Sequence, residues 1–207
     1  MAGRVIPEPY SYPKIPHVRR HGPDGWITYS KYLHWLRDDF TFRCVYCLER
    51  EVWRDMRQRM HIDHFEPQAI RPDLKCEYTN LLYLCPACNS HKSDSILPDP
   101  CVVALGDCLQ VYKDGRIEAL NVLGEQIIDV LALDQPLAKQ RRRFVIGNIL
   151  SHAENSWQMF VEWMRYPENL PNLDDSQNKP PHNEKPEGVA QSFFEKRRRG
   201  ELGSVNK

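Results

Sequence analysis

The chain reads HIDHFEPQAIRPDLKCEYTNLLYLCPACNSHK from residue 61 to residue 92. This stretch holds an Asp-His pair, then a lone Asn, then a Cys-x-x-Cys motif that is followed at once by another Asn. A second Cys-x-x-Cys, at Cys44 and Cys47, lies just upstream. Side chains that bind metals or transfer protons are therefore concentrated in one segment, and we expect the rest of the chain to support it.

Two cysteine pairs, Cys44 with Cys47 and Cys85 with Cys88, suit a tetrahedral zinc ion. The gap between them is longer than in a simple zinc ribbon, so the ion would join the two ends of the intervening segment. Four sulfur ligands leave no open position, which predicts a structural ion worth roughly 10–16 kcal/mol to folding. Chance spacing and a redox Cys-x-x-Cys are the alternatives. The remaining cysteines are expected to be small buried hydrophobes: Cys76, Cys101 and Cys108.

A length of 207 residues fits one domain, or one domain with appendages, and a composition of 41% hydrophobic and 27% charged residues predicts a globular core. No apolar run approaches the roughly 20 residues that span a bilayer, and the N-terminus lacks a secretory signal, so we expect a cytoplasmic protein without disulfides. Lys plus Arg and Asp plus Glu balance at 28 each, which disfavours a nucleic-acid partner without excluding one. Basic residues are nevertheless clustered at Arg54, Arg57 and Arg59, at Arg141 to Arg143, and at Arg197 to Arg199.

The predicted fold class is α+β, in four consecutive parts. Residues 1–25, rich in proline and basic side chains, are expected to form an extended arm. Residues 26–98 would form the zinc-containing domain. Residues 99–166 would add a hairpin and a long helix that pack on it. The polar residues 167–207 would be a tail, with disorder as far as about residue 189.

Within residues 26–98, apolar residues at helical spacing predict a helix from Ile27 to Asp39. Residues 51–65 are expected to form two short antiparallel strands, the first containing Val52 and Trp53. A loop would follow up to residue 79, then a further element over residues 81–84 and a short helix over residues 89–95.

Beyond Pro98, the Asp114-Gly115 pair predicts a hairpin between residues 109–113 and 116–120. Asp134 is expected to cap one long helix with Pro136 in its first turn. Residues 192–199 could form a short basic helix, although a solvated tail is favoured. The long helix carries one apolar stripe, which indicates core packing: Val145, Ile149, Ala153, Trp157, Val161 and Met164.

Asp63 and His64 are neighbours on a predicted strand, so their side chains point to opposite sides. They are poorly placed to bind one ion together and well placed for two separate roles. Asp63 can hold a hard divalent cation, whereas His64 can take a proton from water because the reference pKa of histidine is about 6.5. An Asp-His dipeptide alone usually reflects surface polarity, so the interpretation depends on the whole set of residues.

That set resembles the HNH endonucleases, which belong to the His-Me finger or ββα-metal class. The resemblance implies a small ββα-metal core, with Asp63 as a metal ligand and His64 as the general base. It also implies that Asn80 holds the loop that orients His64, and that Lys92 lies near phosphate. The family pattern is matched at Cys44 and Cys47, at Asp63-His64 with Pro67, at Asn80-Leu81, at Cys85 and Cys88, and at Lys92.

The chain departs from the family pattern at one position, because Asn89 stands where the last histidine is expected. An amide oxygen together with Asp63 favours Mg²⁺ or Mn²⁺ over softer metals. His91 is the alternative ligand, although two residue steps on a helix turn it to another side. His61 shares a strand face with Asp63, where it would either line the site or be structural.

The resulting hypothesis is a metal-dependent DNA endonuclease with structural Zn²⁺ and catalytic Mg²⁺ or Mn²⁺. RNA is not separated from DNA as a substrate, and His61, His91 and Lys92 are the candidate contacts to nucleic acid. The alternative is a non-catalytic zinc module that binds nucleic acid or protein. By analogy with proteins of this build, a role in bacterial defence or restriction and an ATPase partner are expectations.

Overall fold

The computed structural model describes residue 6, residues 8–53 and residues 60–206. Within these ranges the chain is a mixture of helices and two-stranded antiparallel sheets, as the α+β class predicts. The predicted cluster at Arg54, Arg57 and Arg59 lies outside them. The helices are α1 (Leu33–Asp39), α2 (Pro86–Lys92), α3 (Val122–Leu131), α4 (Pro136–Asn155), α5 (Trp157–Met164), α6 (Glu187–Ala190) and α7 (Phe193–Arg198). The paired strands are β1 (Pro23–Asp24) with β6 (His182–Asn183), β2 (His61–His64) with β3 (Leu81–Leu84), and β4 (Leu109–Val111) with β5 (Ile117–Ala119).

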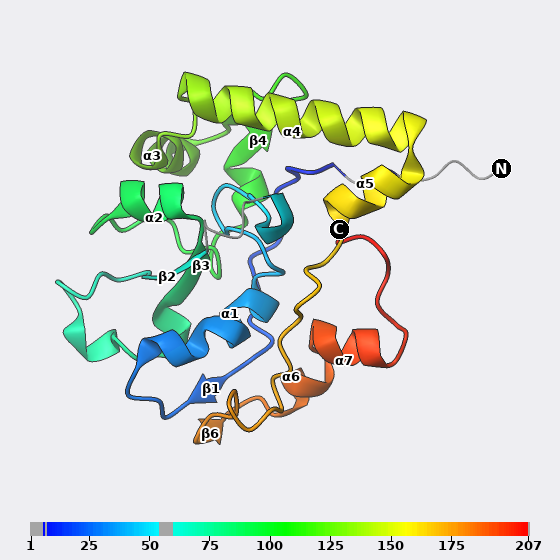
Figure 1. Ribbon diagram of the computed structural model, residues 1–207. Helices are drawn as coiled ribbons and strands as arrows, with labels where there is room; N and C mark the ends of the chain where they lie inside the picture. Colours follow the sequence, from blue (N-terminus) through cyan, green and yellow to red (C-terminus); the bar gives the residue numbers. More distant parts are fainter. Residues whose placement is uncertain (1–5, 7, 54–59, 207) are drawn as a thin grey trace.

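The central hairpin consists of β2 and β3, with His61 opposite Leu84 and His64 opposite Leu81. All four residues of β3 are buried, so this strand forms part of the core, and α2 starts two residues after it ends. α2 also begins three residues before the predicted start at Asn89. In Figure 1 the hairpin and α2 lie in the middle of the molecule, between α1 below and α3 and α4 above.

The predicted strand at Val52 and Trp53 is wrong, because residues Glu51–Trp53 form a 3₁₀ turn. The apolar strand β3 takes its place as the partner of β2. Trp53 instead turns toward α5, where its indole Nε1 donates a hydrogen bond to the Trp163 carbonyl at 2.7 Å. Local alternation of polar and apolar residues did not reveal this tertiary contact.

The predicted helix over residues 27–39 is confirmed in part, as a 3₁₀ turn (Tyr29–Tyr32) that continues into α1. Asp38 and Asp39 are fully buried at the end of α1. The extended N-terminal arm pairs with them: the Arg20 guanidinium lies 3.1 Å from Asp38 Oδ1, and the Arg20 backbone N–H donates to Asp39 Oδ1 at 2.8 Å. The arm is therefore part of the folded unit.

The predicted hairpin around Asp114-Gly115 is confirmed, and Gly115 has a φ of 81°, which favours glycine. The single long helix is wrong: it is divided at Ser156, whose φ of −155° and ψ of 92° are extended. α4 starts after Gln135 rather than Asp134. The sequence analysis also missed α3, which Asn121 caps by accepting a hydrogen bond from the Gly124 N–H at 3.0 Å.

The C-terminal segment is folded, which corrects the expected disorder up to residue 189. β6 pairs with β1, and α6 and α7 follow, so the basic helix that seemed the weaker alternative is formed. Phe193 is buried against Phe42 and Tyr166, and its backbone N–H donates to Asp38 Oδ2 at 2.8 Å. Figure 1 shows this segment running beside α1 and back toward α5.

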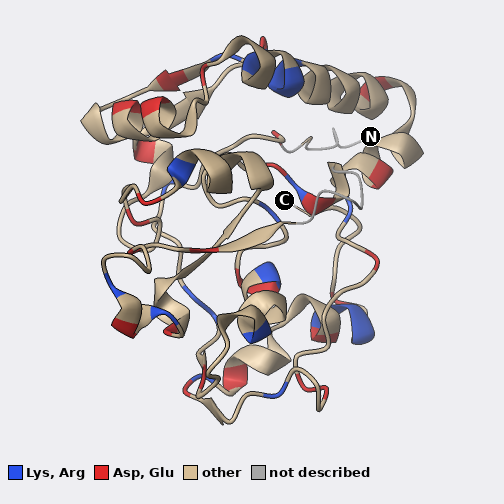
Figure 2. Ribbon diagram, turned by 60° about the vertical axis from the view of Figure 1, so that its left-hand side comes forward, with Lys and Arg blue, Asp and Glu red and all other residues tan. Residues whose placement is uncertain are grey.

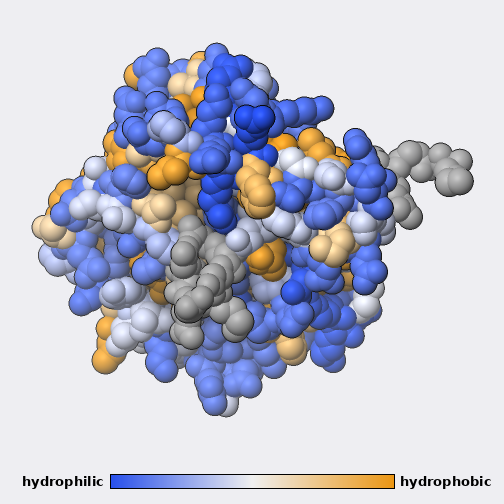
Figure 3. Space-filling view, turned by 45° about the horizontal axis from the view of Figure 1, so that its top comes forward, coloured by the Kyte–Doolittle hydropathy of each residue, from blue (hydrophilic) through white to orange (hydrophobic). Residues whose placement is uncertain are grey.

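Acidic and basic residues are distributed over all parts of the fold (Figure 2). Figure 3 shows small apolar patches among hydrophilic side chains on the face that carries α4. In the described ranges, the helices are too short or too polar to cross a membrane. In the two basic clusters that the structure describes, Arg141 pairs with Glu49, Arg142 donates to the Gly115 carbonyl at 2.8 Å, and Arg198 pairs with Glu195.

Candidate metal and hydrolytic site

The four predicted zinc ligands converge, and their sulfur atoms all lie within 4.8 Å of one another. Cys47 Sγ and Cys85 Sγ are 3.6 Å apart. Zn–S bonds of about 2.3 Å in a tetrahedron place sulfur atoms about 3.8 Å apart, so the cluster fits a zinc ion. Cys44, Cys85 and Cys88 are buried, which leaves the cluster little access to solvent.

Backbone hydrogen bonds shape the first of the two cysteine turns. The Leu48 N–H donates to the Cys44 carbonyl at 3.0 Å, and the Cys44 N–H donates to the Glu49 carbonyl at 2.8 Å. Leu48 adopts a φ of 60°, a left-handed conformation that is uncommon for leucine. The Val45 N–H donates to the Tyr83 carbonyl at 3.1 Å, which joins this turn to β3.

The second turn is the start of α2. Cys85 is its N-cap, its sulfur accepting a hydrogen bond from the Cys88 N–H at 3.4 Å, and Pro86 is the first helical residue. Hydrogen bonds from Cys44, Cys47 and Cys88 lower the pKa of the Cys85 thiol well below its usual range. A thiolate at this position is the form that binds a metal ion.

His64 is buried at the end of β2, and both of its ring nitrogens have partners. Nε2 lies 3.0 Å from the Lys75 carbonyl oxygen, and Nδ1 lies 3.2 Å from the Gln68 amide nitrogen. A carbonyl can only accept, so Nε2 carries the hydrogen of the neutral ring and Nδ1 is the basic nitrogen. The Tyr29 ring packs edge-on against the imidazole, with centroids 5.0 Å apart.

Asn80 clamps the loop that separates β2 from β3. Its side-chain oxygen accepts from the Glu66 N–H at 2.8 Å, and its amide nitrogen donates to the carbonyls of Glu66 at 3.1 Å and Leu74 at 3.3 Å. The Phe65 N–H donates to the Asn80 carbonyl at 2.8 Å. These contacts fix the backbone directly after His64.

Asp63 faces Lys92 of α2, whose side chain is completely buried. Lys92 Nζ lies 2.9 Å from Asp63 Oδ2 and donates to the His64 carbonyl at 2.7 Å. Within the described ranges, Asp63 Oδ2 is nonetheless a buried oxygen that no well-aligned hydrogen bond reaches. A carboxylate oxygen is a ligand that suits a hard cation such as Mg²⁺, and the Asp63 side chain remains 16% exposed.

The burial of Lys92 differs from the predicted phosphate contact, because its ammonium points into the protein rather than toward solvent. Asn89 lies one helical turn before Lys92, on the same face of α2, and is partly exposed. His91 and His61 are exposed. The structure thus brings together Asp63, His64 and Lys92, with Asn89 on the helix face that meets β2.

Sequence reasoning missed two neighbours of His64. Gln68 is four residues further along the chain, in a loop with no regular pattern to place it. Tyr29 comes from the turn before α1, which was recognised as helical but carried no signal of a contact with His64. The third partner of His64 is the backbone carbonyl of Lys75. Every residue has such a carbonyl, so the residue type at position 75 could not indicate this hydrogen bond.

Comparison with known proteins agrees with this assignment for part of the chain. Residues 44–95 match the family model described as HNH endonuclease. The matched segment includes both cysteine pairs, β2, β3 and α2. The suspected family is therefore confirmed over this segment. No curated protein matches the chain.

Proposed function

We propose that this protein is a metal-dependent endonuclease that hydrolyses phosphodiester bonds of DNA. The match of residues 44–95 to the HNH endonuclease model indicates nuclease-type chemistry. We interpret β2, β3 and α2 as a ββα-metal core that the four-cysteine cluster holds closed with zinc. The observation that carries the proposal is the arrangement at the end of β2, where the fixed imidazole of His64 directly follows the carboxylate of Asp63, whose Oδ2 lies 2.9 Å from Lys92 Nζ of α2.

His64 is assigned as the general base. Because Nε2–H is bound to the Lys75 carbonyl, the ring cannot rotate freely and Nδ1 is the nitrogen that accepts a proton. In the reaction, water takes the place of the Gln68 amide at Nδ1 and loses its proton to the ring as it attacks phosphorus. The hydrogen bond to the Lys75 carbonyl then stabilises the imidazolium.

Asp63 and Asn89 are the residues that would hold the catalytic cation, Mg²⁺ or Mn²⁺. Both offer hard oxygen atoms, and both lie where β2 meets α2. When bound, the cation stabilises charge on the phosphate and on the leaving 3′ oxygen. Asn80 supports the site indirectly, by holding the backbone that follows His64.

Contact with nucleic acid is assigned to the exposed residues His61 and His91, at the ends of β2 and α2. The even charge balance and the ion pairs of Arg141 with Glu49 and of Arg198 with Glu195 imply weak affinity that depends on salt. Lys92 is no longer proposed as a phosphate contact, since its side chain is fully buried.

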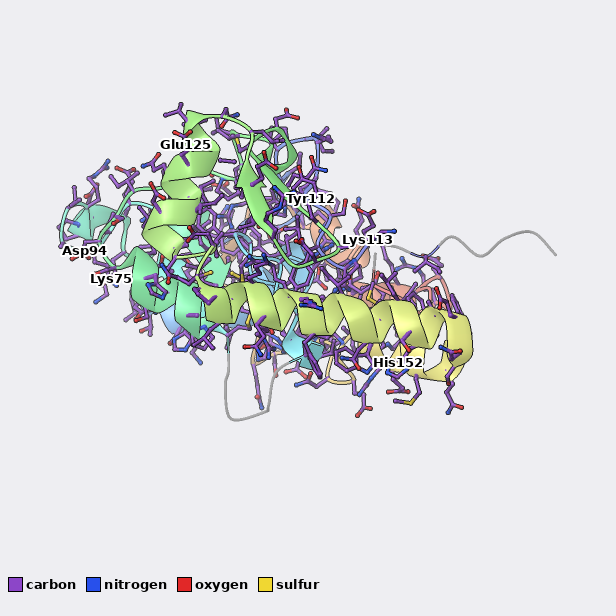
Figure 4. The ribbon with its side chains drawn as sticks, turned by 90° about the horizontal axis from the view of Figure 1, so that it is seen from above. Lys75, Asp94, Tyr112, Lys113, Glu125 and His152 are labelled. Atoms are coloured by element: carbon purple, nitrogen blue, oxygen red, sulfur yellow. The ribbon has the colours of Figure 1, made fainter. Side chains whose placement is uncertain are left out.

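The proposal is tested by nicking of supercoiled plasmid with the zinc-loaded protein and Mg²⁺ or Mn²⁺, and a parallel assay on RNA. We expect cleavage that requires added Mg²⁺ or Mn²⁺ and is absent when the zinc-loaded protein is assayed without either ion. His64→Ala should abolish it, whereas His152→Ala, the same change at the far end of α4 (Figure 4), should not. Cleavage of RNA but not of DNA would show that RNA, rather than DNA, is the substrate.

One observation favours the alternative, a non-catalytic zinc module. Gln68 holds the basic nitrogen of His64, and Lys92 holds the carboxylate of Asp63, so both groups have partners in the protein itself. This alternative predicts tight zinc, no cleavage with any divalent ion, and an Asp63→Ala variant that binds nucleic acid like the unmodified chain.

A further inference from the structure

Lys92 is a buried cation whose charge faces the proposed metal ligand. Its ammonium is inaccessible to solvent, lies 2.9 Å from Asp63 Oδ2 and donates to the His64 carbonyl at 2.7 Å. A charge in the protein interior is costly unless an opposite charge is close. The Asp63 carboxylate supplies that charge, and the His64 carbonyl fixes the direction of the ammonium.

This pairing sets the charge balance of the site. The charges of Asp63 and Lys92 cancel, so this pair offers a divalent cation no net negative charge. A cation bound to Asp63 would also lie within several ångströms of the Lys92 ammonium, where the low dielectric makes repulsion between like charges strong. The Lys92 side chain is completely buried at the end of α2, so solvent does not screen this repulsion.

A phosphodiester group would offset the repulsion between Lys92 and a bound cation, because it adds a negative charge beside the cation. We infer that Lys92 makes cation binding at Asp63 depend on the phosphate of the nucleic acid, so that cation and substrate bind cooperatively. Lys92 is then a regulatory element of the site rather than a contact to substrate. The inference rests on the proposed function in one respect, the assignment of Asp63 as a ligand of the catalytic cation.

Thermodynamic reciprocity gives the inference a second consequence. If phosphate raises the affinity for the cation by some factor, the cation raises the affinity for nucleic acid by the same factor. Couplings of this kind between sites are typically about 5- to 150-fold. The free protein would hold little Mg²⁺, and the nuclease would be assembled only on its substrate.

The test measures Mn²⁺ binding by electron paramagnetic resonance, with and without a short DNA duplex. All proteins are full-length, zinc-loaded and carry His64→Ala, which prevents cleavage and keeps the backbone carbonyl that binds Lys92. Lys92→Met removes the buried charge with similar volume. Lys113→Met is the matched control, because Lys113 is exposed at the tip of the β4–β5 hairpin, far from the Lys75 loop in Figure 4.

In the background protein, we expect DNA to strengthen Mn²⁺ binding at least about fivefold. Lys92→Met should bind Mn²⁺ at least about fivefold more tightly without DNA, and should lose most of the coupling. Lys113→Met should behave like the background protein. Equal DNA-free affinity in Lys92→Met and the background, or DNA that leaves Mn²⁺ affinity unchanged in the background, would overturn the inference.

Two further variants separate the possible failures. If Asp63→Ala leaves DNA-dependent Mn²⁺ binding intact, the metal assignment in the proposed function is wrong. If Asp63→Ala removes binding but Lys92→Met changes nothing, only the role of Lys92 is wrong. If Lys92→Met fails to fold, Lys92→Gln takes its place, because glutamine retains a hydrogen-bond donor to the His64 carbonyl. The effect of DNA on Mn²⁺ affinity in the background protein tests the coupling without any change at residue 92.

Discussion

The side chain of Asn80 and the backbone of Glu66 form a reciprocal pair of hydrogen bonds, at 2.8 Å from the Glu66 N–H and at 3.1 Å to the Glu66 carbonyl. Asn80 and Glu66 are 14 residues apart, at the two ends of the loop between β2 and β3. His64 lies directly before this clamp. The position of the proposed base therefore depends on an amide that need not touch the substrate.

Replacing Asn80 with Asp tests this clamp with almost no change in volume. The retained oxygen can still accept from the Glu66 N–H, but the second oxygen faces the carbonyls of Glu66 and Leu74 and cannot donate to them. Unpaired buried polar groups cost roughly 1–3 kcal/mol each. We expect Asn80→Asp to lower thermal stability and cleavage together, with zinc retained.

The readouts for Asn80→Asp are a thermal melt, the zinc content and the cleavage rate. Asn178→Asp is a useful control, because Asn178 donates to the Asn172 carbonyl at 2.8 Å in the C-terminal segment rather than at the site. An Asn80→Asp protein with unchanged stability and unchanged cleavage would show that the clamp is dispensable.

Removal of zinc should unfold the central unit. The hairpin of β2 and β3 is short, and both cysteine turns attach directly to it or to α2. Structural zinc supplies roughly 10–16 kcal/mol to folding in small domains. We expect Cys88→Ser to lose zinc and to melt far below the unmodified chain, whereas Cys76→Ser should keep one zinc per chain and an unchanged melting temperature. Retention of the fold in metal-free protein would contradict this.

His17 predicts a specific dependence of stability on pH. Burial lowers the pKa of its imidazole to about 4, with Arg19 and Arg20 acting in the same direction and Asp39 opposing them. Because the folded pKa lies below the usual 6.5, the unfolded chain binds the proton first as pH falls. Stability is therefore unaffected by this group above pH 6.5 and is lost between about pH 6.5 and 4.

The size of the effect is roughly 2–3 kcal/mol, after a reduction for the partial exposure of the ring. Urea unfolding at pH 7 and pH 4.5 measures it. His17→Gln removes the titrating group, so its loss of stability between the two pH values should be smaller than that of the unmodified chain by about this amount. Equal losses in both proteins would show that His17 does not contribute.

Phe193 tests whether the C-terminal segment is folded. Its ring is buried against Phe42 and Tyr166, and the Arg20 guanidinium lies 4.6 Å from the ring centroid. Replacing a buried phenylalanine with alanine costs roughly 3–5 kcal/mol. We expect Phe193→Ala to destabilise the protein and to expose residues 193–206 to proteolysis, while Phe144→Ala, at a ring that is 63% exposed, should have little effect. Rapid proteolysis of this segment in the unmodified chain would contradict the folded arrangement.

Much of the metal site could be predicted from sequence, because its chemistry is carried by residue type and spacing. The two cysteine pairs converge as expected, and Asp63 is adjacent to His64 by necessity. The hairpin at Asp114-Gly115 could also be predicted, because the preference of these two residues for a tight turn does not depend on distant parts of the chain. The family match over residues 44–95 agrees with these motifs.

The rest depended on tertiary contacts that no local pattern encodes. Trp53 donates a hydrogen bond to the Trp163 carbonyl, and the strand predicted at Val52 and Trp53 is not formed. The C-terminal segment is polar overall, but one buried phenylalanine and the Asp38 carboxylate hold it to α1. Lys92 was expected near phosphate from the resemblance to the HNH endonucleases, whereas in the structure it is buried and contacts the Asp63 carboxylate and the His64 carbonyl.

The most direct test of the account is the single-turnover rate of DNA cleavage by zinc-loaded protein carrying His64→Ala or Gln68→Ala. A general base typically contributes about 10²- to 10⁴-fold to the rate. His64→Ala should therefore lose at least about 100-fold with zinc retained. Gln68→Ala should cleave at least as fast as the unmodified chain, because it frees Nδ1 of His64. An unchanged rate in His64→Ala would contradict the central claim that this imidazole activates the attacking water.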